Sequence, residues 1–206
     1  MGMKPPIRRI AVVVLALLSG SHMGCTVVFK PRIKPVTDYP ASERFDLRVH
    51  LHFDNDFLNA EWRSKLDRTY ILPVGQVLKE NTQLLAQSLF REVVVTEGDQ
   101  VRPVDSVDAT LIPRVVSVDR SLSVFAFGQA DTVISVEWPL ATTTGALVWV
   151  ATIQGKGTAM NGNNFTLHNQ VRKQLQGATN DLFAKTYAAI SSSPEIRAFA
   201  SDRIRP

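Results

Sequence analysis

Two histidines at alternate positions come nearest to a metal-binding pattern in this chain. His50 and His52 lie in the stretch RFDLRVHLHF, where alternate residues of a strand would project to the same side. A bound metal needs three or four ligands, and the other candidates, His168 and Asp46, do not stand at a diagnostic spacing from the pair. We therefore predict no metal site, and we interpret the two histidines as part of a polar strand face shared with Asp46 and Arg48.

Three other patterns that could do chemistry are incomplete. The run DND at 54–56 resembles the start of a calcium loop, but Leu58 and Asn59 stand where that loop needs a ligand and a glycine. The triplet GKG at 155–157 is too short for a phosphate-binding loop, and no serine lies in a Gly-x-Ser-x-Gly turn. The sequence thus predicts no catalytic residue and no cofactor, and a protein that is not an enzyme.

Aromatic residues in two segments are better read as contact points. Phe125 and Phe127 lie in LSVFAFG at 122–128, between two predicted strands. They either sit on an exposed loop that contacts a partner or a lipid, or continue a strand into the core. Trp62, in the polar segment EWRSKLDR, is either an anchor of the same kind or a core residue on a helix face.

The beginning of the chain has the three parts of an export signal. Lys4, Arg8 and Arg9 precede the apolar run 10–18, and the small polar residues 19–21 follow it. Nine apolar residues are about half of what a membrane-spanning helix needs. Basic start, short apolar middle and small-residue end predict a signal peptide over residues 1–24.

The single cysteine of the chain, Cys25, follows this leader directly. A lone cysteine cannot form an internal disulfide, and an oxidising compartment disfavours a free thiol. The pair Gly24-Cys25 behind an apolar run resembles the cleavage junction of the bacterial lipoproteins. This resemblance implies a lipid on Cys25 and, because Thr26 rather than Asp follows, an outer-membrane protein that faces the periplasm. Ordinary cleavage after Ser21 is the alternative.

Charge and composition limit the functions of the mature chain. The leader contains three of the 23 basic residues and no acid, which leaves 20 basic against 19 acidic side chains. We therefore expect no nucleic-acid partner, because such a protein needs a clustered basic face. Prolines at 31, 35 and 40 predict an extended, proline-bearing tether over 25–42, with an edge strand and loop packed on the domain as the alternative. Residues 43–206 are expected to form one domain.

Hydrophobic periodicity predicts the elements of that domain. Strict alternation over 44–53, a helical stripe over 74–90 and the short strand 92–96 indicate a right-handed βαβ unit with parallel strands. Further strands are predicted at 109–118, where Pro113 favours an edge or a bulge, and at 132–140 and 146–154, which form a hairpin around the turn 142–145. A long helix is predicted at 167–190, and a short one begins behind Ser193.

Together these elements predict an α+β two-layer sandwich with a mixed sheet of four to five strands and helices on one face. Lipidated cysteine, tether and this order of elements are similar to auxiliary lipoproteins of envelope transport and assembly systems, such as those of lipid-transport ABC systems and of lipopolysaccharide export. The similarity implies a membrane-tethered, non-enzymatic accessory protein with an envelope protein as partner. The alternative is a periplasmic carrier for a lipid or small ligand, with its pocket between sheet and helices.

Overall fold

The computed structural model describes most of the chain behind the leader. Within that part no helix is both long and apolar enough to cross a membrane. The described residues are 26–40, 44–65, 69–101, 104–121, 129–160 and 167–203.

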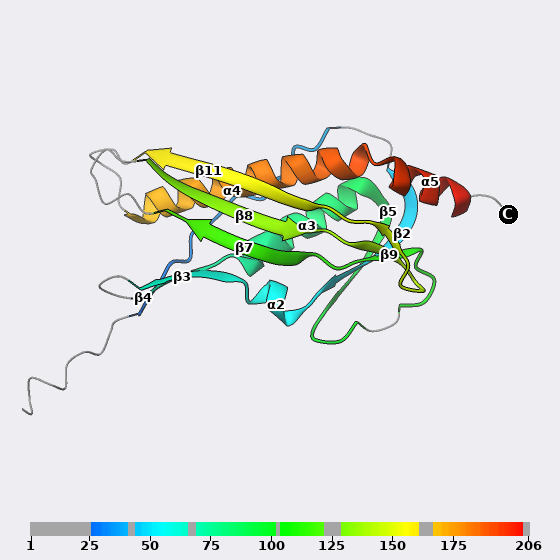
Figure 1. Ribbon diagram of the computed structural model, residues 1–206, viewed down its shortest axis with the longest axis horizontal. Coiled ribbons are helices and arrows are strands. Elements are labelled where there is room, and N and C mark those ends of the chain that lie inside the picture. Colours follow the sequence, from blue (N-terminus) through cyan, green and yellow to red (C-terminus); the bar gives the residue numbers. More distant parts are fainter. Residues whose placement is uncertain are drawn as a thin grey trace, which may run out of the picture.

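A βαβ unit forms the centre of the domain, as predicted. Strand β2 (Phe45–Phe53) is followed, after an insertion, by helix α3 (Gly75–Leu89) and strand β5 (Phe90–Glu97), which pairs in parallel with β2. The alternation in β2 places Leu47, Val49 and Leu51 fully in the core. Helix α3 packs against both strands, so the predicted crossover is confirmed (Figure 1).

The mixed sheet around β2 has five strands in the order β10-β9-β6-β2-β5. Strand β6 (Ala109–Leu111) runs parallel to β2, whereas β9 (Leu140–Thr142) and β10 (Leu147–Trp149) are antiparallel additions. The turn between β9 and β10 lies at the predicted place, with Gly145 at a φ of 86° and its N–H donating to the Thr142 carbonyl. The fold class predicted from the pattern is therefore confirmed.

A second sheet continues the first one and has the order β11-β8-β7. Strands β8 (Gln129–Glu137) and β11 (Thr152–Met160) pair over their whole lengths, and β7 (Arg114–Arg120) lies at the edge. The predicted hairpin is therefore longer than its pattern, because it crosses from one sheet into the other at Trp138 and Ala151, where the Trp138 N–H donates to the Ala151 carbonyl. The strand predicted over 109–118 is divided at Ile112 and Pro113 into β6 and β7, which belong to different sheets.

The segment expected to be a plain connection forms further structure. It contains the short helix α2 (Asn55–Leu58) and the hairpin of β3 (Glu61–Lys65) with β4 (Thr69–Pro73). Strand β1 (Thr26–Val28) adds to β4 in parallel and completes a third sheet, β1-β4-β3. Sequence reasoning missed this sheet because its strands are short and because β1 pairs with β4 across about forty positions of the chain.

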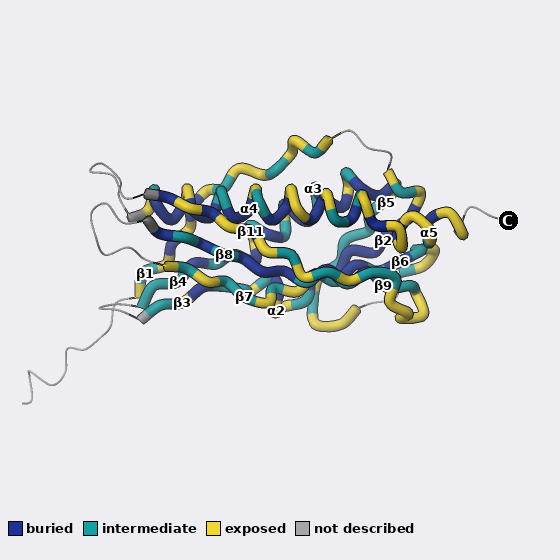
Figure 2. The backbone as a smooth tube through the Cα atoms, turned by 45° about the horizontal axis from the view of Figure 1, so that its top comes forward, coloured by how far each residue is buried: buried dark blue, intermediate teal, exposed yellow. Residues whose placement is uncertain are grey.

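The long helix α4 (Leu167–Ser191) covers the sheet of β8 and β11 and also contacts α3, and α5 (Pro194–Arg203) follows it. Figure 2 shows the buried stretches of α3, α4 and the central strands facing one another inside the molecule. Ser193 begins α5 as predicted, because its Oγ accepts a hydrogen bond from the Ile196 N–H at 3.2 Å.

Candidate functional site

Several of the predicted site residues lie outside the described part of the chain. These are the signal peptide 1–24, the lipidation residue Cys25 and the two loop aromatics, Phe125 and Phe127. Their predicted roles stay predictions. The first described residue is Thr26, which begins strand β1.

The two histidines of β2 lie inside the protein and share one hydroxyl group. His50 is 2% and His52 1% exposed, and the Thr96 Oγ1 lies 2.6 Å from His50 Nε2 and 2.8 Å from His52 Nδ1. Burial, and then the neighbouring His52, lower the pKa of His50 below its ordinary value. No group of three metal-ligating side chains occurs among the described residues. The face that carries these histidines is thus covered rather than wet.

The triplet GKG at 155–157 has a packing role in the structure. A Cβ atom at Gly155 would overlap the carbonyl oxygen of Ala178, and one at Gly157 would overlap that of Gln174. Both glycines therefore let β11 approach α4 more closely than any side chain would allow. Gly177 lies on the helix opposite them, where a Cβ would stand 3.1 Å from the Gly157 Cα.

Trp62 lies on strand β3, and not on a helix face. Its side chain is 9% exposed and belongs to the hydrophobic core. The Arg120 guanidinium covers the ring, with its Cζ 5.2 Å from the ring centroid. On its other side, Arg120 Nε donates to the Gln174 Oε1 of α4 at 3.0 Å. A half-buried arginine whose terminal nitrogens are buried thus lies between β3, the end of β7 and the first turns of α4.

Residues 29–40, which we call the strap, lie against the domain. Phe29 is buried, and its N–H continues the β1–β4 pairing by donating to the Ile71 carbonyl. Farther along, the Val36 N–H donates to the Oδ1 of the buried Asn81 on α3 at 2.7 Å, and the Tyr187 hydroxyl of α4 donates to the Pro40 carbonyl at 2.6 Å. The described residues of the predicted tether therefore follow the packed alternative, an edge strand and a docked extended segment.

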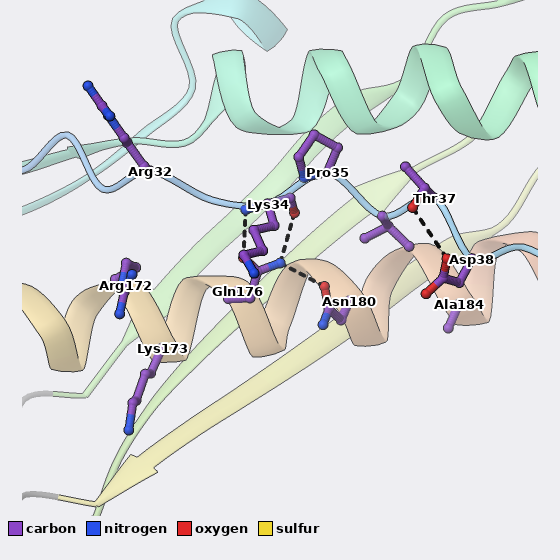
Figure 3. Close-up of a pocket in the computed structure, with 11 residues that line it drawn as sticks. Arg32, Lys34, Pro35, Thr37, Asp38, Arg172, Lys173, Gln176, Asn180 and Ala184 are labelled. Carbon is purple, nitrogen blue, oxygen red and sulfur yellow. Dashed lines mark hydrogen bonds between the residues drawn. The ribbon is translucent and has the colours of Figure 1, made fainter.

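Two adjacent hollows lie along α4 beside the strap, with volumes of about 640 and 550 Å³. In the larger one, the Gln176 amide is held between the Lys34 backbone and Asn180 (Figure 3). The same view shows Arg32 and Lys173 pointing away from each other, so the cations around this hollow do not converge on one point. The smaller hollow is more apolar, and the stacked rings of Tyr39 and Tyr187 are part of its wall.

Sequence reasoning overlooked Arg120 and its partners on α4. Gln170 and Gln174 are 2% and 0% exposed, although they carry polar side chains. The signal was present, because both glutamines stand beside the apolar stripe of Val171 and Leu175 and four residues apart, so they share one side of the helix. Two polar residues four positions apart, next to the buried apolar stripe of a helix, can thus indicate a polar contact inside the protein.

No protein-family model and no curated protein matches this sequence. Among solved structures, the chain is similar to several bacterial proteins, lipoproteins among them. XCC0632 from Xanthomonas campestris, with the family-model DUF330, is 11% identical with a TM-score of 0.47, covering 80% of this chain and 93% of that one. A minor lipoprotein from Acinetobacter baumannii is 14% identical with a TM-score of 0.42, at coverages of 73% and 94%. The PelC dodecamer from Paraburkholderia phytofirmans is 16% identical with a TM-score of 0.40, at 74% and 93%. The likeness is distant, and no functional residue is transferred from it.

Proposed function

We propose that this chain is a lipid-anchored protein of the bacterial cell envelope that acts as a non-enzymatic accessory component of a transport or assembly system. The leader and the Gly24-Cys25 junction support export and lipidation. The lipid anchors the protein in the outer membrane, with the domain in the periplasm and an envelope protein as its partner.

One structural observation supports an accessory role at the membrane surface itself. Thr26 pairs with Thr69 and Val28 with Ile71 in the parallel β1–β4 ladder. Consecutive Cα atoms are about 3.8 Å apart, so a lipid on Cys25 would be attached one residue away from a paired strand. The end of the domain that contains the β1–β4 ladder would therefore lie close to the membrane surface rather than at the end of a long flexible tether.

The anchor itself is tested by changing Cys25→Ser and separating membranes from periplasm. The parent protein is expected in the membrane fraction and the variant in the soluble fraction. A variant that sediments with membranes as the parent does would contradict lipidation at Cys25.

The orientation of the β1–β4 end toward the membrane is tested in vesicles that carry the lipidated protein. Because Cys25 is the single cysteine and its thiol is consumed by lipid, an introduced cysteine is the free thiol for labelling. A fluorophore at T69C, beside Thr26, is expected to be quenched strongly by quenchers on lipid headgroups. A fluorophore at T143C, in the turn between β9 and β10, is the matched control at the other end of the molecule (Figure 1) and is expected to be quenched weakly. Equal quenching at both positions would overturn the orientation.

The second candidate function is a carrier for a lipid or small ligand. It is supported by the smaller hollow beside α4, whose wall combines Tyr39, Tyr187 and Ala188 with the strap. Mass spectrometry of the protein purified with its whole strap distinguishes the two functions. Stoichiometric co-purifying lipid favours the carrier, and its absence together with capture of one envelope protein favours the accessory component.

A further inference from the structure

Arg120 and two glutamines of α4, Gln170 and Gln174, have buried hydrogen-bond donors without acceptors. Both terminal nitrogens of Arg120 and the Nε2 atoms of Gln170 and Gln174 are buried and have no hydrogen-bond partner. These four atoms are among ten such atoms in the described part of the chain. Buried donors are nearly always paired, because leaving one unpaired costs about 1–3 kcal/mol. Arg120 Nε is bonded to Gln174, and Gln170 lies one helical turn from Gln174, so an acceptor from outside the described chain could satisfy these donors together.

The charge of this cluster is also unbalanced. Among the described residues, Arg120 forms no ion pair, and the acids on neighbouring strand positions are engaged elsewhere. Asp119 accepts a hydrogen bond from Ser117 at 2.9 Å, and Asp131 pairs with Lys156 at 2.9 Å. Burial lowers the pKa of Arg120 to about 10, so the guanidinium still carries its charge at neutral pH. The missing acceptor is therefore expected to be an anion.

One hydrogen-bond acceptor of the cluster, the Gln174 Oε1, already accepts two hydrogen bonds. Gln174 Oε1 accepts from Arg120 Nε at 3.0 Å and from the Thr132 hydroxyl at 3.4 Å, whereas its Nε2 has no acceptor. Gln170 lies one helical turn before Gln174 on the same side of α4. Two amide groups and a guanidinium fork supply several N–H donors from a fixed frame, an arrangement that suits the oxygens of a phosphate.

The cluster lies close to the end of the domain that bears the leader. Arg120 covers Trp62, Trp62 is opposite Leu72 in the β3–β4 ladder, and Thr69, three residues before Leu72, pairs with Thr26. Three strand residues span about 10 Å. A lipid anchor at Cys25 would thus bring the donor cluster to about the level of the phospholipid headgroups.

We propose that Arg120, Gln170 and Gln174 form a binding site for a phosphate group presented by a membrane phospholipid. The donor cluster stands on its own contacts, whereas the choice of lipid as the source of the phosphate rests on the proposed anchor at Cys25. Inorganic phosphate is the other source of the same chemistry.

The test uses the full lipidated protein in a neutral maltoside detergent and follows its thermal unfolding midpoint. The probes are dihexanoyl phosphatidylglycerol, inorganic phosphate, and dihexanoylglycerol, which has the same acyl chains without the phosphate. The phosphatidylglycerol is expected to raise the midpoint, and dihexanoylglycerol is not. An equal effect of inorganic phosphate at the same concentration would overturn the lipid as source, and no effect of either phosphate probe would overturn the site.

Variants locate the site. Q170L keeps the side-chain volume while removing an unpaired donor, so the free protein is expected to be at least as stable as the parent. Its affinity for the phosphatidylglycerol is expected to fall about tenfold or more, and that of R120M likewise.

R91M removes an exposed arginine that pairs with Asp46 and is expected to bind as the parent does. Unchanged affinity in Q170L would overturn the site even if R120M fails to fold. If phosphatidylglycerol binding depends on Arg120 while C25S leaves membrane association unchanged, the proposed lipidation at Cys25 is wrong. The proposed phosphate site is then still supported.

Discussion

The side-chain amide of Gln176 forms two hydrogen bonds with the backbone of Lys34. The Lys34 N–H donates to Oε1 at 2.7 Å, and Nε2 donates to the Lys34 carbonyl at 2.9 Å. A glutamine on a helix thus occupies both backbone groups of one strap residue, as a neighbouring strand would. This pair of bonds is the first of three attachments along the strap, at Lys34, Val36 and Pro40, that hold it on α3 and α4.

The change Q176L is expected to loosen the strap without unfolding the domain. Loss of three exposed hydrogen bonds, two to Lys34 and one to Asn180, is expected to lower the free energy of unfolding by about 1–2 kcal/mol and to speed hydrogen exchange at the Lys34 amide. R172A changes an exposed residue of the same helix and is the control, expected within about 0.5 kcal/mol of the parent. An unchanged exchange rate at Lys34 in Q176L would mean that the amide pair does not hold the strap.

The change G157A is expected to push β11 away from α4. The added methyl group would overlap the Gln174 carbonyl and the Ala178 amide, and overpacking of this kind costs on the order of 1–3 kcal/mol. Urea unfolding measures the loss. T158A, at an exposed position of the same strand, is the matched control. If both variants are equally stable, the close approach of strand and helix is not required.

Stability is expected to fall as the pH is lowered through the titration of histidine. Burial lowers the pKa of His50 below 6.5, the value expected in the unfolded chain, so the unfolded state binds protons at a higher pH than the folded state does. The free energy of unfolding is therefore highest above about pH 7 and decreases as the pH falls below 6.5.

Urea unfolding at a series of pH values from 7.5 to 5 tests this dependence. H50Q keeps a group that can bond to Thr96 but cannot titrate, and its profile is expected to be flatter than that of the parent. H168Q, at an exposed position on α4, is the control for the loss of a histidine. A parent-like slope in H50Q would assign the pH dependence to other groups.

The change S193A removes the N-cap of α5. The lost hydrogen bond to the Ile196 N–H is expected to cost about 1 kcal/mol and to increase hydrogen exchange in the first turn of the helix. S192A lies one residue earlier in an exposed position and does not cap α5, so it is the comparison. Similar exchange in the two variants would show that packing of Ile196, and not the cap, fixes the start of the helix.

Sequence patterns predicted the central strands, helices, turn and helix cap of this fold because each of these elements depends on residues that are close together in the sequence. The alternation of β2, the stripe of α3, the turn at Gly145 and the cap at Ser193 each follow from residues within a few positions of one another. The pairing of Thr26 with Thr69 and the contact of Arg120 with Gln174 join residues far apart in sequence. No periodicity links residues so far apart, so the addition of β1 to β4 and the contact of Arg120 with the glutamine side of α4 became visible only in three dimensions.

The long hairpin of residues 129–160 connects the two larger sheets of the domain. Its two arms run as β8 and β11 beside α4 and continue as β9 and β10 into the other sheet, and Figure 1 shows them spanning most of the long axis of the molecule. Near its far tip, Leu147 and Val150 are 60% and 45% exposed. The exposed tip is thus joined through the paired strands β8 and β11 to Thr132, whose hydroxyl donates to the Gln174 Oε1 of α4 at 3.4 Å, so one hairpin links both ends of the domain.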